Sequence, residues 1–185
     1  MIREKNGINN RQDNGQVLKN TCLFMIELLP VILSVFMIFG FSADTGDESS
    51  KLSLIVSEKL IGFLRRIIYR DTSSFDTGVI TDPYAALRFE PLVRKAAHVF
   101  EYALLGLFSS VFLFFRKLKD RALMLFSLCF CFIVSVSDEL YQLSVPERSG
   151  SVRDVFIDLS GSFPAIALFI LILKLIRKIK EDYRF

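Results

Sequence analysis

Apolar residues occur in long blocks along this chain, without the fine polar alternation of a soluble domain. A helix that crosses a lipid bilayer needs about 20 mostly apolar residues, and four segments have this character. We predict membrane-spanning helices at 21–41, 96–115, 122–143 and 155–175. The pattern therefore predicts an all-α integral membrane protein with four transmembrane helices.

A fifth, extracytoplasmic helix is predicted between the first two spans, because residues 51–70, "KLSLIVSEKLIGFLRRIIYR", are amphipathic at helical spacing. Its apolar face consists of Leu52, Val56, Leu60, Phe63 and Ile67, and Ser53, Ser57, Lys59, Arg66 and Arg70 fall outside that face. Such a helix either lies in the membrane interface or packs on the outer end of the bundle, and periodicity alone does not decide between them. The stretch "RDTSSFDTG" that follows has the composition of a loop.

Basic residues predict the direction of the spans. Lysine and arginine cluster in segment 1–20, in the turn "RKLKDR" between the second and third spans, and in segment 177–185. With four spans these clusters fall on one side, and such clusters mark the cytoplasmic side. We therefore predict two cytoplasmic tails around a membrane domain of residues 21–176. The first apolar block exceeds the core of a signal peptide, about 7–15 residues, so we expect it to remain as an anchor.

Composition narrows the function classes. The 185 residues are 52% hydrophobic, and the net charge of +3 is mild. Because the basic residues flank apolar blocks, no nucleic-acid partner is expected. The three cysteines lie in apolar stretches and do not suggest a disulfide framework. The sequence carries no nucleophile motif, phosphate-binding glycine loop or dinucleotide fingerprint.

Ionisable residues inside the spans gather at one predicted depth. The second span would enter from outside at Ala96, so His98, Glu101 and Tyr102 lie near its outer end on one face. The third span ends outside, the fourth begins there, and both carry acids at those ends. Charged groups in a span are costly unless they face the bundle interior or a wet cavity. We therefore predict an outward-facing polar pocket of His98, Glu101, Asp138, Glu139, Gln142 and Asp158.

The connection between the third and fourth spans is predicted to form a lid above this pocket. The lid consists of Pro146, Glu147, Arg148, Ser149, Gly150 and Arg153. Arg148 and Arg153 carry planar, always-charged groups suited to a carboxylate or a phosphate. They can equally neutralise the nearby acids, and both interpretations stand. Ser151 and Asp154 resemble a capping box that opens the fourth span.

Two stretches together resemble a known family. "RKAAHVFEYALLG" and "SDELYQLSVPERSGSVRDVFIDLSG" are similar to the VanZ-like family of small bacterial membrane proteins, and "FGFSADTGDESSKLS" resembles one of its branches. The resemblance covers residues 88–164. The family's signature falls on His98, Glu101, Tyr102, Asp138, Glu139, Gln142, Pro146, Arg148, Asp154, Asp158 and Gly161. After Gly161 the chain departs from the small residues common in relatives and has "SFPAI".

The resemblance implies a four-helix protein of the bacterial plasma membrane. The founding member is associated with resistance to teicoplanin, which implies a role in glycopeptide and lipoglycopeptide susceptibility. The ligand-binding candidates are His98, Glu101, Tyr102, Asp138, Glu139, Gln142, Arg148, Arg153, Asp154 and Asp158. Expected partners are membrane lipids and a lipid-linked wall precursor or a lipoglycopeptide.

Three functions remain open from the sequence. The pocket binds an amphiphile, or it is the site of a lipid hydrolase or transferase with Glu101 or Glu139 as general acid–base beside His98, or its residues serve only structure and assembly. His98 and Glu101 are accordingly a proton-exchanging pair or part of an interhelical hydrogen-bond network. Metal binding by Asp138 and Glu139 with His98 is a minor interpretation, because the chain has one histidine and no zinc-type spacing. We expect no metal and no cofactor.

Overall fold

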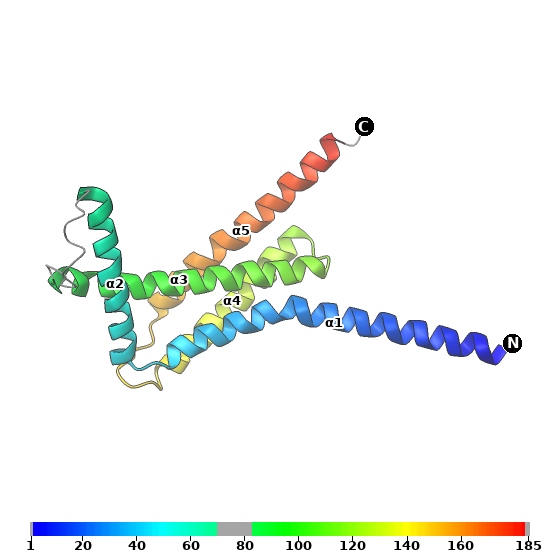
Figure 1. Cartoon of the computed structure of the whole chain (residues 1–185), viewed down its shortest axis with the longest axis horizontal. Coiled ribbons are helices and arrows are strands. Elements are labelled where there is room, and N and C mark those ends of the chain that lie inside the picture. Colours follow the sequence, from blue (N-terminus) through cyan, green and yellow to red (C-terminus); the bar gives the residue numbers. More distant parts are fainter. Residues whose placement is uncertain (1, 70–82, 184–185) are drawn as a thin grey trace.

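The computed structural model describes residues 2–69 and 83–183, and these residues form five helices and no strand (Figure 1). The helices are α1 (Ile2–Ala43), α2 (Gly46–Tyr69), α3 (Pro83–Phe115), α4 (Asp120–Gln142) and α5 (Val152–Asp182). Four of them are long and apolar enough to cross a membrane, so the predicted all-α membrane fold is confirmed. The loop predicted at 70–78 lies outside the described residues.

The membrane-crossing helices are longer than the sequence prediction. Their candidate spans are Gln16–Ala43, Ala86–Phe115, Asp120–Gln142 and Val152–Asp182. Helix α3 begins at Pro83 rather than Ala96, because Arg94 and Lys95 interrupt the apolar block without interrupting the helix. Hydropathy locates the part of a helix that suits lipid, whereas the helix itself continues while its backbone hydrogen bonds are made.

Helix α3 is the centre of the bundle, because it contacts each of the other four helices. One apolar core joins α1, α3 and α4 and contains Val31, Ile38, Tyr102, Leu105, Cys131 and Val134. A second core between α4 and α5 contains Leu123, Ile166 and Ile170. Large apolar side chains such as Phe36 and Phe156 remain exposed, which suits helices surrounded by lipid.

Small residues allow the close crossing of α3 and α5. A Cβ atom at Gly161 would collide with the backbone carbonyl oxygen of Val99. A Cβ atom at Gly106 would lie 2.9 Å from the carbonyl oxygen of Ser162. The two glycines therefore let the backbones approach. The "SFPAI" segment keeps Ser162, which is fully buried, at this contact, so the departure from the family pattern preserves tight packing here.

Helix α2 lies across one end of the bundle and crosses α3 there (Figure 1). It contacts α3, and the small polar residues Ser53 and Ser57 are buried. The predicted apolar face is exposed along its whole length at Leu52, Val56, Leu60, Phe63 and Ile67. Because the apolar face is turned away from the bundle, the structure favours a helix lying in the membrane interface over one packed through its apolar face.

The bundle has two distinct ends (Figure 1). We call the end beside α2 and the α4–α5 loop the α2 end. The opposite end, which holds the turn between α3 and α4, is the turn end. The predicted polar residues of the spans lie at the α2 end, as the next section describes.

Candidate functional site at the α2 end

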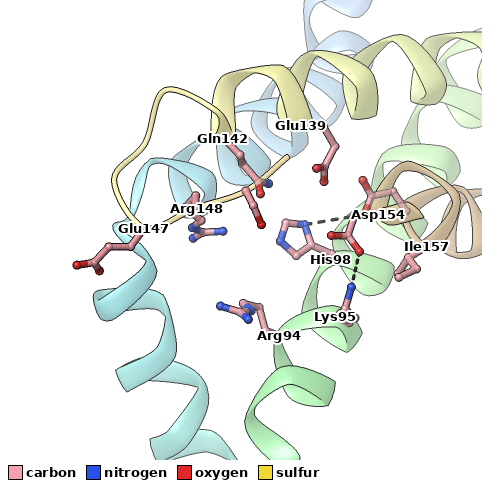
Figure 2. A pocket seen from close by; sticks show the side chains of 11 residues that line it. Arg94, Lys95, His98, Glu139, Gln142, Glu147, Arg148, Asp154 and Ile157 are labelled. Atoms are coloured by element: carbon pink, nitrogen blue, oxygen red, sulfur yellow. Dashed lines mark hydrogen bonds and ion pairs between the residues drawn. The ribbon is translucent and has the colours of Figure 1, made fainter. Parts of the chain in front are cut away.

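A polar pocket lies at the α2 end, among α3, α4, α5 and the loop 143–151 (Figure 2). Its volume is 140 Å³, which is room for several water molecules or one small polar group. The lining side chains are Arg94, Lys95, His98, Glu139, Gln142, Glu147, Arg148, Ser149, Asp154, Ile157 and Asp158. Residues of both charge signs therefore face one small space.

The loop that covers the pocket is fastened to the junction of α1 and α2. Arg148 donates from Nε to the Asp44 carbonyl oxygen (3.1 Å) and from Nη2 to the Phe41 carbonyl oxygen (2.9 Å). Backbone acceptors at the end of a helix lack helical partners, so these bonds satisfy the end of α1. The Glu147 carboxylate accepts a hydrogen bond from the Asp47 backbone N–H at the start of α2 (3.1 Å). Two charged side chains thus hold the predicted lid in place.

Arg148 also contributes positive charge to the pocket. Burial lowers the pKa of its guanidinium from the ordinary value, and the nearby Arg94 acts in the same direction. An arginine nevertheless stays charged at neutral pH. Figure 2 shows the guanidinium groups of Arg94 and Arg148 beside the His98 ring. The pocket therefore contains two fixed cations in addition to its acids.

Helix α5 begins at the predicted N-cap residue, but the acid that accepts a hydrogen bond from the backbone N–H of this residue is not the predicted one. Ser151 is the N-cap, and its hydroxyl accepts a hydrogen bond from the Arg153 backbone N–H (3.2 Å). In a capping box the Ser151 N–H would pair with Asp154. Asp154 instead forms an ion pair with Lys95, and the Ser151 N–H donates to Oε2 of Glu139 at 2.6 Å. The cap therefore links α5 to α4, which an isolated capping box would not do.

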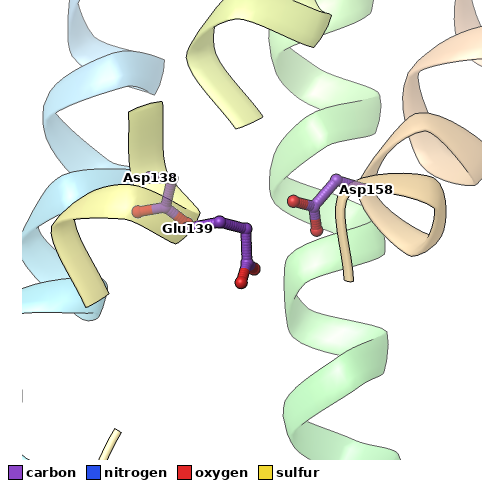
Figure 3. A group of neighbouring side chains, drawn as sticks. All are labelled: Asp138, Glu139 and Asp158. Carbon is purple, nitrogen blue, oxygen red and sulfur yellow. The ribbon is translucent and has the colours of Figure 1, made fainter. Parts of the chain in front are cut away.

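Three carboxylates form the floor of the site (Figure 3). Asp138 and Glu139 come from α4 and Asp158 comes from α5. One oxygen of each lies within 4.8 Å of one oxygen of each of the others. Asp138 is fully buried, and the exposed fractions of Glu139 and Asp158 are 8% and 1%. Two helices therefore bring three acids to one point.

A hydrogen-bond donor holds each of the two aspartates. Gln142 Nε2 donates to Oδ2 of Asp138 (3.0 Å) and lies 3.2 Å from the Ser42 hydroxyl of α1. Ser135 donates from its hydroxyl to Oδ2 of Asp158 (2.6 Å). These bonds fix the direction of both carboxylates, and they use one oxygen of each.

His98 and Glu101 lie beside this floor on α3. Nδ1 of His98 is 3.9 Å from Oε2 of Glu101 and 3.9 Å from Oδ1 of Asp158. Both distances are too long for a direct hydrogen bond. The Nδ1 atom, Oε2 of Glu101 and the Tyr102 hydroxyl are all buried without a hydrogen-bond partner among the described residues. Such groups in a native fold call for a ligand, a water molecule or a proton that completes them.

Of the ten ligand-binding candidates, six line the pocket and three are buried without lining it, with one exception. His98, Glu139, Gln142, Arg148, Asp154 and Asp158 line the pocket. Glu101, Tyr102 and Asp138 are buried and do not line it. The exception is Arg153, which is exposed and does not line the pocket. Of the two predicted lid arginines, only Arg148 faces the acids.

Sequence reasoning did not select two cations of the site. Arg94 and Lys95 line the pocket from α3, and neither was among the ligand-binding candidates. Arg94 lies one helical turn before His98 and therefore shares its face. That spacing is visible in the sequence, but both residues precede the predicted start of the span at Ala96 and were not selected.

A comparison with protein families identifies the chain. The family model described as VanZ/LLP1 matches residues 27–174. The chain belongs to the VanZ/LLP1 family. The matched region begins in α1 and ends in α5, so it contains every residue of the pocket and its floor. Separate comparisons with curated proteins and with solved structures found no match.

Membership in the VanZ/LLP1 family agrees with the four apolar helices, and the chain is a multi-pass membrane protein of that family. The resemblance drawn from His98, Glu101 and the following motifs is therefore confirmed. In this VanZ/LLP1 chain, six residues of that resemblance line one pocket although they come from three helices and a loop: His98, Glu139, Gln142, Arg148, Asp154 and Asp158.

Proposed function

We propose that this VanZ/LLP1 protein lies in the bacterial plasma membrane with both termini in the cytoplasm, and that its pocket binds the polar head group of an amphiphile. The ligand class includes lipid-linked wall precursors at the outer surface. Binding would alter susceptibility to glycopeptide and lipoglycopeptide antibiotics such as teicoplanin. The observation that carries the proposal is a small pocket lined by three cationic side chains, Arg94, Lys95 and Arg148.

The chemistry of these side chains supports an anionic head group. An arginine guanidinium matches a carboxylate or phosphate with two parallel hydrogen bonds, and lysine adds a point charge. Arg148 uses two of its nitrogens on carbonyl oxygens, which leaves Nη1 without a hydrogen bond among the described residues. The volume of 140 Å³ suits a head group and not a whole antibiotic.

The position of α2 supports an amphiphile rather than a soluble ligand. Its exposed apolar face lies at the same end of the bundle as the pocket. A helix of this kind sits at the boundary between acyl chains and head groups. A ligand with its tail in the bilayer would therefore present its head group at the level of the pocket.

The test is expression of the chain in a teicoplanin-susceptible Gram-positive host. The minimal inhibitory concentration of teicoplanin and the binding of a fluorescent lipoglycopeptide to the cell surface are both measured. We expect the protein to change both quantities, and His98→Ala and Glu101→Gln to abolish the change while membrane abundance stays equal. Glu58→Gln, an exposed acid on α2, is the matched control and should behave as the wild type.

Two outcomes contradict the proposal. Wild-type protein that is abundant in the membrane and changes neither quantity rejects it. So does a change in susceptibility that survives in both His98→Ala and Glu101→Gln.

A second candidate, a small membrane hydrolase or transferase, is supported by one observation. His98 lies 3.9 Å from both Glu101 and Asp158, which is close enough for proton exchange through one bound group. This activity predicts a converted lipid in cells that overproduce the protein. Mass spectrometry of their lipids, compared with cells that carry Glu101→Gln, tests it, and identical lipid profiles reject it.

A further inference from the structure

We infer that the carboxylates of Asp138, Glu139 and Asp158 form a binding site for a divalent cation of the oxygen-preferring class, such as Mg²⁺, Mn²⁺ or Ca²⁺. The inference concerns the floor beneath the proposed head-group pocket and does not depend on that pocket's ligand. From the sequence, metal binding was a minor interpretation, because the chain has one histidine and no zinc-type spacing. The fold supplies a different criterion, which is the meeting of oxygen ligands from two helices.

The distances among the three carboxylates suit one ion. One oxygen of each carboxylate lies within 4.8 Å of one oxygen of each of the others. Oxygen ligands sit about 2.0–2.6 Å from Mg²⁺ or Ca²⁺, so two ligands on opposite sides of an ion are about 4–5 Å apart. An ion in the middle of the group would therefore reach all three carboxylates with little movement of the helices.

The hydrogen bonds around the group orient it for this task. Gln142, Ser151 and Ser135 each donate to one oxygen of Asp138, Glu139 and Asp158 in turn. Within the described part of the chain, no hydrogen bond reaches the second oxygen of any of the three, and Oδ1 of Asp138 is buried. Hydrogen bonds of this kind hold metal-binding carboxylates in position and raise metal affinity.

Charge balance also favours a bound cation. Among the described residues, no lysine or arginine forms an ion pair with any of the three acids or with Glu101. The nearby cations have other partners: Lys95 pairs with Asp154, and Arg94 lies 3.7 Å from Glu90. Uncompensated buried charge costs several kcal/mol per ion. A divalent ion would compensate two of these charges at once.

Glu101 gives an independent indication of a missing group. It is 6% exposed, its Oε2 atom has no hydrogen-bond partner among the described residues, and it does not belong to the three-acid group. That atom lies 3.9 Å from His98 Nδ1, which lies 3.9 Å from Asp158. Glu101 thus lies next to the three-acid group on the α3 side, with His98 Nδ1 between it and Asp158. Water molecules bound to the cation would give Glu101 and His98 the donors and acceptors that they lack.

An entry path for the ion exists. Glu139 and Asp158 belong both to the floor and to the lining of the pocket. The inner group is therefore open to the pocket on one side, as a site must be for an ion to enter. The donor set is mostly carboxylate oxygen, which favours Mg²⁺, Mn²⁺ and Ca²⁺ over Zn²⁺.

The experiment uses Mn²⁺ as the probe on the full chain in detergent micelles, with no lipid ligand added. Electron paramagnetic resonance of free Mn²⁺ measures how much the protein binds. We expect one Mn²⁺ per chain, competition by Mg²⁺ or Ca²⁺, and a loss of affinity of ~10-fold or more in Asp138→Asn and Asp158→Asn. Glu58→Gln, a matched acid-to-amide change on exposed α2, should bind as the wild type does. Size-exclusion profiles confirm that each variant is folded.

Several outcomes overturn the inference. The absence of Mn²⁺ binding at millimolar concentration would mean that the acids are neutralised by protons. Binding that is equal in folded wild type, Asp138→Asn and Asp158→Asn would place the ion elsewhere, and binding of Zn²⁺ without Mn²⁺ would reject the oxygen-preferring class. None of these results bears on antibiotic susceptibility, so failure here is distinguishable from failure of the proposed function.

Discussion

The two ends of the bundle treat buried charge in opposite ways. At the turn end, Glu27 of α1 has a side chain that is 6% exposed and forms an ion pair with Arg116. The Arg116 guanidinium also lies over the rings of Phe24 and Phe112, at 5.0 and 5.3 Å from their centroids. The carboxylate therefore has a cation, and the cation has two aromatic faces. The Glu27 carboxylate and the Arg116 guanidinium therefore compensate each other without a bound ligand.

At the α2 end, four carboxylates lie close together without such a partner. Glu101, Asp138, Glu139 and Asp158 come from three helices, and none pairs with a lysine or arginine within residues 2–69 and 83–183. The pair of Glu27 and Arg116 shows that a buried carboxylate in this bundle can be matched with a basic side chain, and the four acids at the α2 end are not matched in this way. At the turn end, paired charge suits a role in stabilising the bundle, and the unpaired charge at the α2 end supports our proposal that this end binds a ligand.

Breaking the pair at the turn end should have the largest effect on stability. Arg116→Ala leaves the Glu27 carboxylate buried without a cation, which costs about 3 kcal/mol or more. We expect a clearly lower unfolding midpoint in detergent micelles and reduced abundance in the membrane. Glu27→Gln should cost less, because the Arg116 side chain is 36% exposed and can turn toward water.

Equal losses in Arg116→Ala and Glu27→Gln would contradict this account, since the asymmetry comes from burial of only one partner. The double variant should be close to Arg116→Ala or more stable than it, because it removes the uncompensated carboxylate. A double-mutant cycle measures the coupling directly.

Arg148→Ala should have the next largest effect, because it acts on the lid as well as on the pocket. The variant loses two hydrogen bonds to carbonyl oxygens at the end of α1, a cost of about 1–3 kcal/mol. Arg148→Lys keeps the charge but cannot reach both carbonyl oxygens with the same geometry. We expect an intermediate unfolding midpoint for the lysine variant, and midpoints equal to the wild type in both variants would show that the lid does not depend on these bonds.

The sequence predicted the α2 end better than the turn end, for a physical reason. His98 and Glu101 are three residues apart on one helix, and Asp138 and Gln142 are four apart, so helical periodicity alone places each pair on one face. The energetic cost of charge in lipid then predicts that these faces meet. The pairing of Glu27 with Arg116 joins residues far apart in the sequence, and no local spacing indicates it.

The packing of α2 shows a similar limit. Periodicity predicted its apolar face correctly but could not tell whether that face meets protein or lipid. The structure buries Ser53 and Ser57 instead, because small side chains let α2 approach α3 closely. For Arg148, its bonds to the Asp44 and Phe41 carbonyl oxygens depend on the path of the backbone, which side-chain chemistry does not predict.

Neutralising one acid at the α2 end should leave stability almost unchanged, in contrast to Arg116→Ala. Asp138→Asn keeps an oxygen that can accept the hydrogen bond from Gln142 and removes one uncompensated charge. In the presence of a chelator, we expect an unfolding free energy within about 1 kcal/mol of the wild type, or higher, as is common when a functional group is removed. A loss of more than about 2 kcal/mol would mean that Asp138 stabilises the fold, as Glu27 and Arg116 do, and the two ends of the bundle would then not differ in this respect.

Arg153→Ala should have the smallest effect of all. Arg153 and Arg148 were equivalent in the sequence as lid arginines, but the Arg153 side chain is exposed and makes no ion pair in the part of the chain that the structure describes. Only its backbone N–H has a role, as donor to the Ser151 cap, and alanine keeps that group. Its unfolding free energy should therefore stay within about 0.5 kcal/mol of the wild type. The same loss in Arg153→Ala and Arg148→Ala would mean that net positive charge near the acids matters, and that the position of each guanidinium does not.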